Sequence, residues 1–147
     1  MSGLSIGDAF GQLFISRQVA SEDDPPLPPG TWCWSDDTQL AVSIVDILGE
    51  YGHIEQGALA AAFARRYAKE PYRASGSGAR RLPWLIGEGC DWRVEAPENF
   101  PGGSYGSGGD MDTTCAIVGG VVALAADNVP TAWQRQRERL PAEFDYA

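Results

Sequence analysis

The chain has 147 residues, 44% of them hydrophobic, and this length suits one globular domain with a buried core. Its formal charge of −9 argues against nucleic acid or an anionic membrane as the main partner, because both are negatively charged. The longest apolar run, Cys115 to Ala126, is too short to cross a bilayer.

The three cysteines (Cys33, Cys90 and Cys115) are far apart and form no CxxC pair. An odd, scattered set of this kind predicts no disulfide framework and fits a reducing compartment. A signal peptide has a basic region followed by an apolar stretch, and the N-terminus has no such pattern. We therefore expect a soluble, cytoplasmic protein.

Helical patterns follow one another along the chain, and alternating strand patterns are nearly absent, so the sequence predicts an all-α protein. Apolar residues from Leu4 to Phe14 predict the first helix, and the acidic, proline-rich stretch 21–30 predicts a surface loop. The next helix begins near Asp37 and ends at Gly49 or Gly52. Further helices are expected over residues 54–69, 77–88, 112–126 and 131–140, with a glycine-rich loop over 98–109.

The helix that begins near Asp37 has an apolar face at helical spacing. This face consists of Leu40, Ala41, Ile44, Val45, Ile47 and Leu48. In the last helix the charged run 135–139 is typical of a solvated face.

Ser35, Asp36, Asp37 and Thr38 form a first acidic motif at a helix start. Its carboxylates and hydroxyls are hard oxygen donors of the kind that Mg²⁺, Mn²⁺ or Ca²⁺ prefers. An N-cap at Ser35 or Asp36, with acidic residues that complement the helix dipole, explains the same residues without a metal. This motif alone leaves both interpretations open.

Asp110, Asp112 and Thr113 belong to a second acidic motif, which follows Gly108 and Gly109 and opens the most apolar helix. Helix capping by Asp112 or Thr113 again explains the residues without a metal. A calcium-binding EF-hand loop is excluded, because the motif lacks the glycine at its sixth position and the glutamate at its twelfth. If the two helix starts meet in space, their carboxylates repel one another strongly unless divalent ions relieve the repulsion.

The two motifs and two further segments resemble the ADP-ribosylglycohydrolase family. The first motif is similar to the family's [ST]-D-D-T sequence, and the second to its late G-G-D-x-D-T sequence. The opening segment 3–11 resembles its G-x-x-x-G-D-A-x-G helix, and Gly103-Ser104-Tyr105-Gly106 resembles a loop that contacts the diphosphate and adenosine of the ligand.

The resemblance implies a compact orthogonal helical bundle and a centre of two divalent ions, Mg²⁺ or Mn²⁺. Its implied activity is metal-assisted hydrolysis of an N- or O-glycosidic bond to ADP-ribose, on a protein or a small molecule. Asp36 or Asp37 is the expected general base. The metal ligands implied by the motifs are Ser35, Asp36, Asp37, Asp110, Asp112 and Thr113.

The chain departs from the family pattern in its middle. Gly106 leads through Ser107 directly into the second acidic motif, where family members have several helices between the two. Ile15 takes the position of a glutamate that some members carry. We expect a shortened single domain over residues 1–147, with the join near 106–109. Dimerisation or helix exchange could cover apolar faces left by the loss. A silent remnant that binds metal or ADP-ribose without hydrolysis is the alternative function.

Other residues have weaker signals. Gly76 and Gly78 at a helix start could offer N–H groups to a phosphate, and Phe100 could stack on adenine, although helix entry and packing explain them equally well. Ser104 also fits a G-x-S-x-G pattern, but an α/β-hydrolase needs a preceding strand and a later histidine, and the single histidine, His53, comes earlier. Asp8 is either a partner that orients metal ligands or a solvated residue of the first helix.

Overall fold

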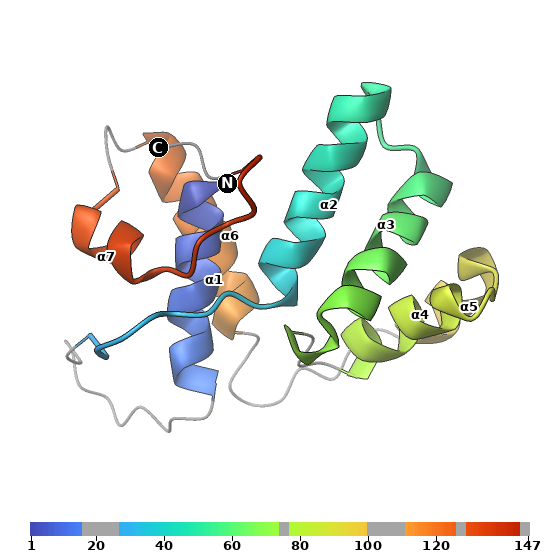
Figure 1. Cartoon of the computed structure of the whole chain (residues 1–147), viewed down its shortest axis with the longest axis horizontal. Helices are drawn as coiled ribbons and strands as arrows, with labels where there is room; N and C mark the ends of the chain where they lie inside the picture. The colour runs from blue at the N-terminus through green and yellow to red at the C-terminus, as the bar shows by residue number, and fades with distance from the viewer. Residues whose placement is uncertain (16–26, 74–76, 100–110, 126–128, 145–147) are drawn as a thin grey trace. The chain divides into compact units, whose positions relative to one another are not determined.

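The computed structural model describes residues 1–15, 27–73, 77–99, 111–125 and 129–144. Within these ranges the protein is helical and contains no strand, only an isolated bridge between Trp32 and Arg137 (Figure 1). The prediction of an all-α fold is confirmed. The helices are α1 Ser2–Ile15, α2 Asp36–Tyr51, α3 Gln56–Lys69, α4 Ser77–Gly87, α5 Trp92–Asn99, α6 Met111–Ala125 and α7 Thr131–Gln136, with the 3-10 turn η1 Pro71–Arg73 between α3 and α4.

The chain divides into two compact units. The first unit contains Met1–Thr38 and Gly106–Ala147, and the second contains Gln39–Tyr105. Helix α2 begins in the first unit and continues in the second. The single domain expected over residues 1–147 stays a prediction. In the part of the chain that the structure describes, no helix has both the length and the apolar character needed to span a membrane.

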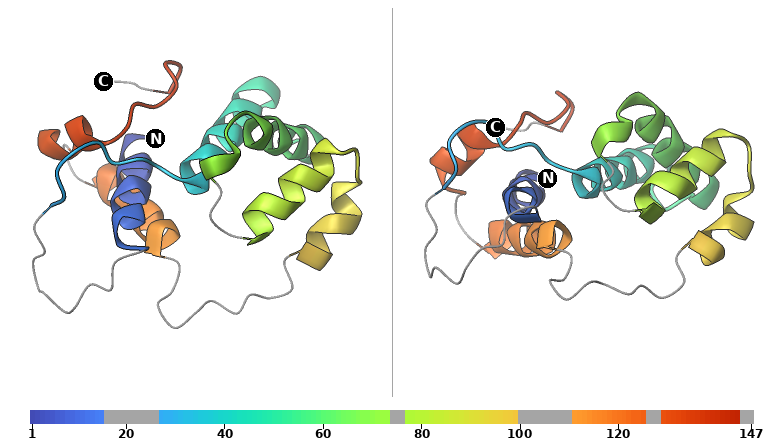
Figure 2. Two further views of the ribbon diagram at one scale, coloured as in Figure 1. Left: turned by 60° about the horizontal axis from the view of Figure 1, so that its bottom comes forward. Right: turned by 90° about the horizontal axis from the view of Figure 1, so that it is seen from below.

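In the first unit, α1 and α6 lie side by side with their backbones in close approach (Figure 2). A Cβ atom added to Gly3 would lie 2.3 Å from the carbonyl oxygen of Gly119, and one added to Gly7 would lie 1.9 Å from that of Cys115. Real Cβ atoms do not approach other atoms so closely, so this crossing requires glycine. Gly3 and Gly7 of the opening segment are therefore needed for packing.

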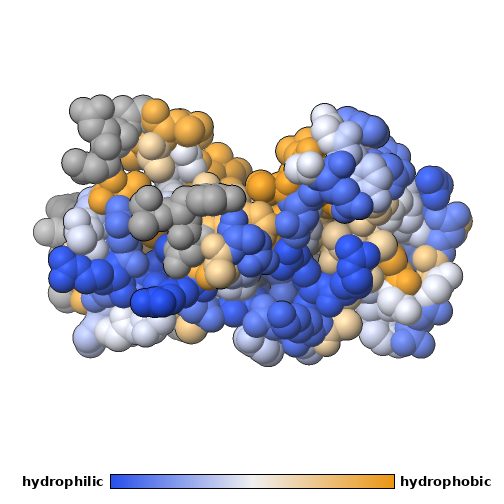
Figure 3. Space-filling model, turned by 45° about the horizontal axis from the view of Figure 1, so that its top comes forward, coloured by the Kyte–Doolittle hydropathy of each residue, from blue (hydrophilic) through white to orange (hydrophobic). Residues whose placement is uncertain are grey.

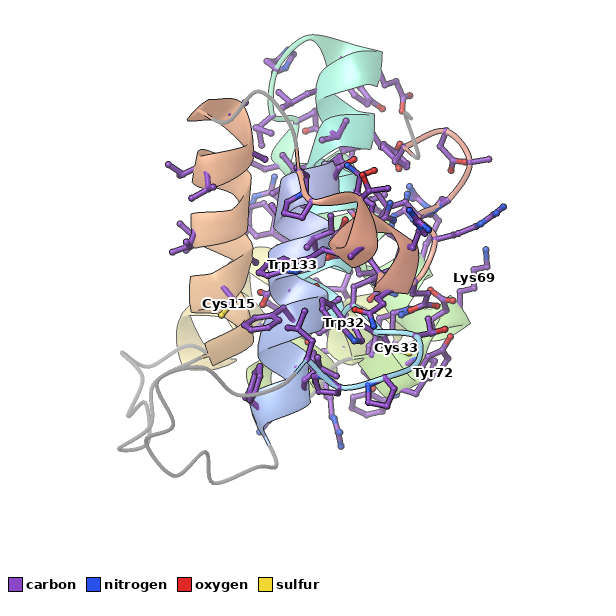
Figure 4. The ribbon with its side chains drawn as sticks, turned by 90° about the vertical axis from the view of Figure 1, so that its left-hand side faces the viewer. Trp32, Cys33, Lys69, Tyr72, Cys115 and Trp133 are labelled. Atoms are coloured by element: carbon purple, nitrogen blue, oxygen red, sulfur yellow. The ribbon has the colours of Figure 1, made fainter. Side chains whose placement is uncertain are left out.

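The aromatic side chains of the first unit form a cluster around Phe10 of α1. Its ring stacks on that of Trp133 of α7, with ring centroids 5.3 Å apart. The ring centroids of Phe10 and Trp32 are 5.9 Å apart. Figure 4 shows Trp32 and Trp133 close to one another beside α1. Trp32 is fully buried, so this cluster fixes the segment that leads into α2.

The C-terminal segment differs from its prediction. Helix α7 ends at Gln136, not Leu140, because the following residues pair with the segment before α2. The N–H group of Trp32 donates to the carbonyl oxygen of Gln136 (2.6 Å), and that of Glu138 donates to Trp32 (2.8 Å). The predicted solvated face is wrong at Arg137, which is only 8% exposed.

In the second unit, α2 and α3 are joined by polar contacts. The side-chain amide of Gln39 donates to the carbonyl oxygen of Arg66 (3.3 Å), and the guanidinium of Arg66 pairs with Asp46. The apolar face predicted for α2 is only partly the buried one, since Val45 and Leu48 are exposed. The buried apolar residues of this unit are Val42, Ile47, Ala60, Ala62 and Ala64.

Helix α5 has no counterpart among the predicted helices. Its start is capped by Asp91, whose carboxylate accepts a hydrogen bond from the N–H group of Arg93 (3.0 Å). The predicted glycine-rich loop begins two residues too early, because α5 continues to Asn99. Short helices with weak apolar periodicity are difficult to recognise in a sequence.

Candidate metal and substrate site

The first acidic motif caps α2. The hydroxyl oxygen of Ser35 accepts a hydrogen bond from the N–H group of Asp37 (3.2 Å), which is the arrangement of an N-cap residue. Asp36 and Asp37 occupy the first turn, where negative charge is stabilised by the helix dipole. The capping interpretation of this motif is thus correct for Ser35.

A second carboxylate, from Asp8 of α1, also holds this helix start. Its Oδ2 atom accepts from the N–H groups of Ser35 (2.9 Å) and Thr38 (3.0 Å) and from the hydroxyl of Thr38 (2.5 Å). Its Oδ1 atom accepts from the hydroxyl of Ser35 (2.7 Å). Asp8 and Thr38 are fully buried, so Asp8 is not a solvated helix residue. It orients the first acidic motif.

The two acidic motifs are in direct contact. The hydroxyl of Thr113, in the first turn of α6, donates to the Oδ2 atom of Asp37 in the first turn of α2 (2.9 Å). These residues are 76 positions apart in the chain, and both lie in the first unit. The helix starts therefore meet in space, as the metal hypothesis requires.

Helix α1 explains why they meet. Asp8 binds the start of α2, and its neighbour Gly7 brings α1 against Cys115, two residues beyond Thr113. A single turn of α1 thus fixes both motifs. Because the contact at Gly7 is between backbones, little adjustment by side chains is possible there.

Several predicted site residues are not part of the described contact. Asp36 is half-buried in the first turn of α2, and Gly78 lies in the first turn of α4, in the second unit. Asp112 belongs to α6, but its side chain is not among those described. The remaining predictions lie outside the described residues: Gly76, Phe100, Gly103, Ser104, Tyr105, Gly106 and Asp110.

The donors that are described suit a hard divalent cation, because they are all carboxylate or hydroxyl oxygens. No group of three or more His, Cys, Asp or Glu side chains able to hold a metal occurs within the described ranges. The residues that would hold an ion are Asp36 and Asp37 with the hydroxyls of Ser35 and Thr113. To extend the carboxylates of Asp36 and Asp37 to a cluster of three or four, Asp110 and Asp112 would have to join them.

The sequence left the role of Asp8 open and placed Thr38 in the first acidic motif without predicting its hydrogen bonds to Asp8. The position of Asp8 in the segment that resembles a G-D-A-x-G helix was the available signal. Its hydrogen bonds join residues 27 and 30 positions apart, and spacing along one helix cannot predict such contacts.

These features define a class: an all-α protein whose candidate site consists of oxygen donors at two adjoining helix starts. A model of the ADP-ribosylglycohydrolase family matches residues 1–107, which is more than half of the chain. The chain belongs to the ADP-ribosylglycohydrolase family, and the suspected resemblance is confirmed.

Two curated relatives carry the name ADP-ribosylhydrolase ARH3. The protein from Bos taurus is 30% identical over 129 residues, a match that covers 76% of this chain and 35% of the relative. The protein from Homo sapiens is also 30% identical over 129 residues, covering 76% of this chain and 36% of the relative. The chain therefore spans about a third of the length of these relatives. No solved structure matches it.

Proposed function

We propose that this protein hydrolyses a glycosidic bond to ADP-ribose with the help of two divalent ions, Mg²⁺ or Mn²⁺. The observation that carries the proposal is the hydrogen bond between Thr113 and Asp37, because it joins the two motifs that would supply the metal ligands. Membership of the ADP-ribosylglycohydrolase family and the names of the two relatives support the type of reaction. An ADP-ribosylated protein or small molecule is the proposed substrate.

In this proposal the residues of the chain have separate tasks. Asp37, with Asp36 beside it, would hold an ion, and one of these two carboxylates would take a proton from the attacking water. Thr113 fixes the carboxylate of Asp37 by its hydrogen bond. When bound, the ions supply positive charge that binds substrate oxygens and acidifies water.

The function is tested with an ADP-ribosylated arginine or serine peptide, incubated with the protein and Mn²⁺. We expect free ADP-ribose to accumulate with the wild type and at least tenfold more slowly with Asp37→Asn, which removes a charge but little volume. Asp91→Asn is the matched control, because Asp91 is also a carboxylate at a helix start but lies in the second unit. Equal release by the wild type and Asp37→Asn contradicts the proposal.

Metal binding is measured separately by calorimetric titration with Mn²⁺ and with Mg²⁺. We expect two ions per chain for the wild type and weaker binding for Asp36→Ala and Asp112→Ala. Binding of Mn²⁺ without release of ADP-ribose identifies a silent metal-binding protein. Titrations that do not change in either variant contradict the proposed ligands.

A further inference from the structure

Asp8 does more than connect α1 to α2, because it determines which way the hydroxyl of Ser35 points. A carboxylate accepts hydrogen bonds and donates none, so the hydroxyl proton of Ser35 must lie between the two side chains (2.7 Å). The backbone N–H group of Asp37 can only donate, so it occupies one of the two lone pairs of the same oxygen. One lone pair of the Ser35 hydroxyl is left.

We propose that Asp8 is a positioning residue that keeps this lone pair of Ser35 directed to a cation. The inference rests on the proposed function, since it assigns a task to a residue that is not itself a metal ligand. The negative charge of Asp8 holds the proton of Ser35 on the far side of the oxygen from the ion. A cation is attracted to a hydroxyl by its lone pair and repelled by its proton.

The surroundings of Asp8 make this orientation a fixed property of the site. Asp8 is fully buried and Ser35 is only 2% exposed, so water does not compete for the hydroxyl proton. The other oxygen of Asp8 accepts from two backbone N–H groups and from Thr38, and these bonds prevent the carboxylate from turning. Buried networks in which each donor finds an acceptor are rigid.

Asp8→Asn is the direct test, because it preserves shape and reverses one hydrogen bond. The amide oxygen can accept the three bonds made to Oδ2, whereas the amide nitrogen replaces Oδ1 and donates to Ser35. The hydroxyl oxygen of Ser35 then accepts two N–H bonds, and its own proton must point to the ion. We expect the affinity for Mn²⁺, measured by calorimetric titration, to fall tenfold or more.

A double-mutant cycle distinguishes this role from a general structural one. If Asp8 acts through the hydroxyl of Ser35, Asp8→Asn lowers the affinity for Mn²⁺ in the wild type but has little further effect in Ser35→Ala. Equal losses in both backgrounds overturn the inference. Thr38→Val is the matched control, because it removes the hydroxyl bond to Asp8 without reversing Ser35. Both backbone N–H bonds to Oδ2 remain and still hold the carboxylate, so we expect the affinity for Mn²⁺ to change less than threefold. A tenfold loss in this control also overturns the inference.

Two further results separate this inference from the proposed function. A wild type that binds no Mn²⁺ rejects both, whereas a wild type and Asp8→Asn of equal affinity reject the role of Asp8 alone. Circular dichroism shows whether Asp8→Asn is folded. If it is not, Ser35→Ala decides the question, because Mn²⁺ binding as tight as in the wild type means that the Ser35 hydroxyl is no ligand.

Discussion

Glu55 begins α3 in a way that depends on its charge. Its carboxylate accepts a hydrogen bond from the N–H group of Ala58, where Ser, Thr, Asp or Asn is the usual cap. This bond, together with one from Gly57, lowers the pKa of Glu55 below its ordinary value of 4.5. The cap is therefore strongest when the side chain is ionised.

This pKa shift predicts how stability depends on pH. A carboxyl group whose pKa is lower in the folded protein stabilises it above pH 4.5, and the contribution is lost as the pH falls through the folded value. We expect Glu55→Gln to melt at a lower temperature than the wild type at pH 6. The difference should shrink as the pH decreases below 4.5 in melting curves followed by circular dichroism. A difference that is constant from pH 6 to pH 3 contradicts this explanation.

The residues of the candidate site were predictable to different degrees. Asp37 and Thr113 stand in motifs that follow the same order as in the family, and the ligand set that this resemblance implies requires the two motifs to meet. For Asp8 the sequence left two roles open, because an aspartate within a helix is usually solvated, and only the tertiary fold brings it to the start of α2. Burial of a charge is costly unless its hydrogen bonds are made, and one sequence does not reveal whether that condition is met.

The crossing of α1 and α6 depends on glycine at particular positions of both helices. Gly119 and Gly120 are adjacent in α6, but only Gly119 is in close contact with the backbone of α1. A Cβ atom on Gly119 would lie 2.4 Å from the carbonyl oxygen of Gly3, whereas one on Gly120 would have its nearest contact 3.8 Å away, at Leu4. The two positions therefore test the crossing with the same chemical change.

We expect opposite effects from alanine at these two positions. Gly119→Ala forces the helices apart and should lower the free energy of unfolding by about 1–3 kcal/mol. Gly120→Ala meets no obstacle and should raise it by about 0.5–1 kcal/mol, because alanine loses less backbone entropy in a helix. Urea unfolding of both variants measures these changes. Effects of the same sign would show that α1 and α6 are not in backbone contact.

The helices themselves were mostly predictable, and the errors have physical causes. Helical spacing predicted α1, α2, α3, α4 and α6 to within two residues at their starts. The predicted last helix was too long because a partner 105 residues away, Trp32, draws Arg137 into an extended bridge. The apolar face of α2 was misjudged because sequence pattern cannot show which apolar residues find a partner. Val42 is buried, whereas Val45 of the same helix is 41% exposed.

At the scale of the whole molecule, the outer side of α6 carries the largest group of exposed apolar residues among the described residues. Side chains on this side of α6 point away from α1 (Figure 4). Figure 3 shows, in orange, that hydrophobic residues also reach the surface on another view of the molecule. The exposed apolar residues of α6 are Ile117, Val118, Val121, Val122 and Leu124, which are 55–90% exposed. A contiguous apolar stripe of this kind is typical of an interface.

We expect a second copy of the same chain to cover this stripe. The formal charge of −9 makes two copies repel one another over most of their surface, but the stripe itself contains no charged residue. A two-fold axis beside α6 would place the same apolar residues of both copies in contact, and each copy would bury the other's exposed valines. The contact is small for a stable dimer, so self-association should depend on concentration.

Sedimentation velocity over a range of concentrations tests this expectation with a matched pair of variants. Val121 and Val94 are 62% and 60% exposed, but Val94 lies on α5 in the second unit. We expect the wild type and Val94→Lys to associate as concentration rises, and Val121→Lys to remain monomeric, because a lysine at the centre of the stripe would have to be desolvated beside its own symmetry mate. Association by Val121→Lys equal to that of Val94→Lys would exclude α6 as the contact. A wild type that stays monomeric throughout would mean that its apolar stripe is not used by a second copy.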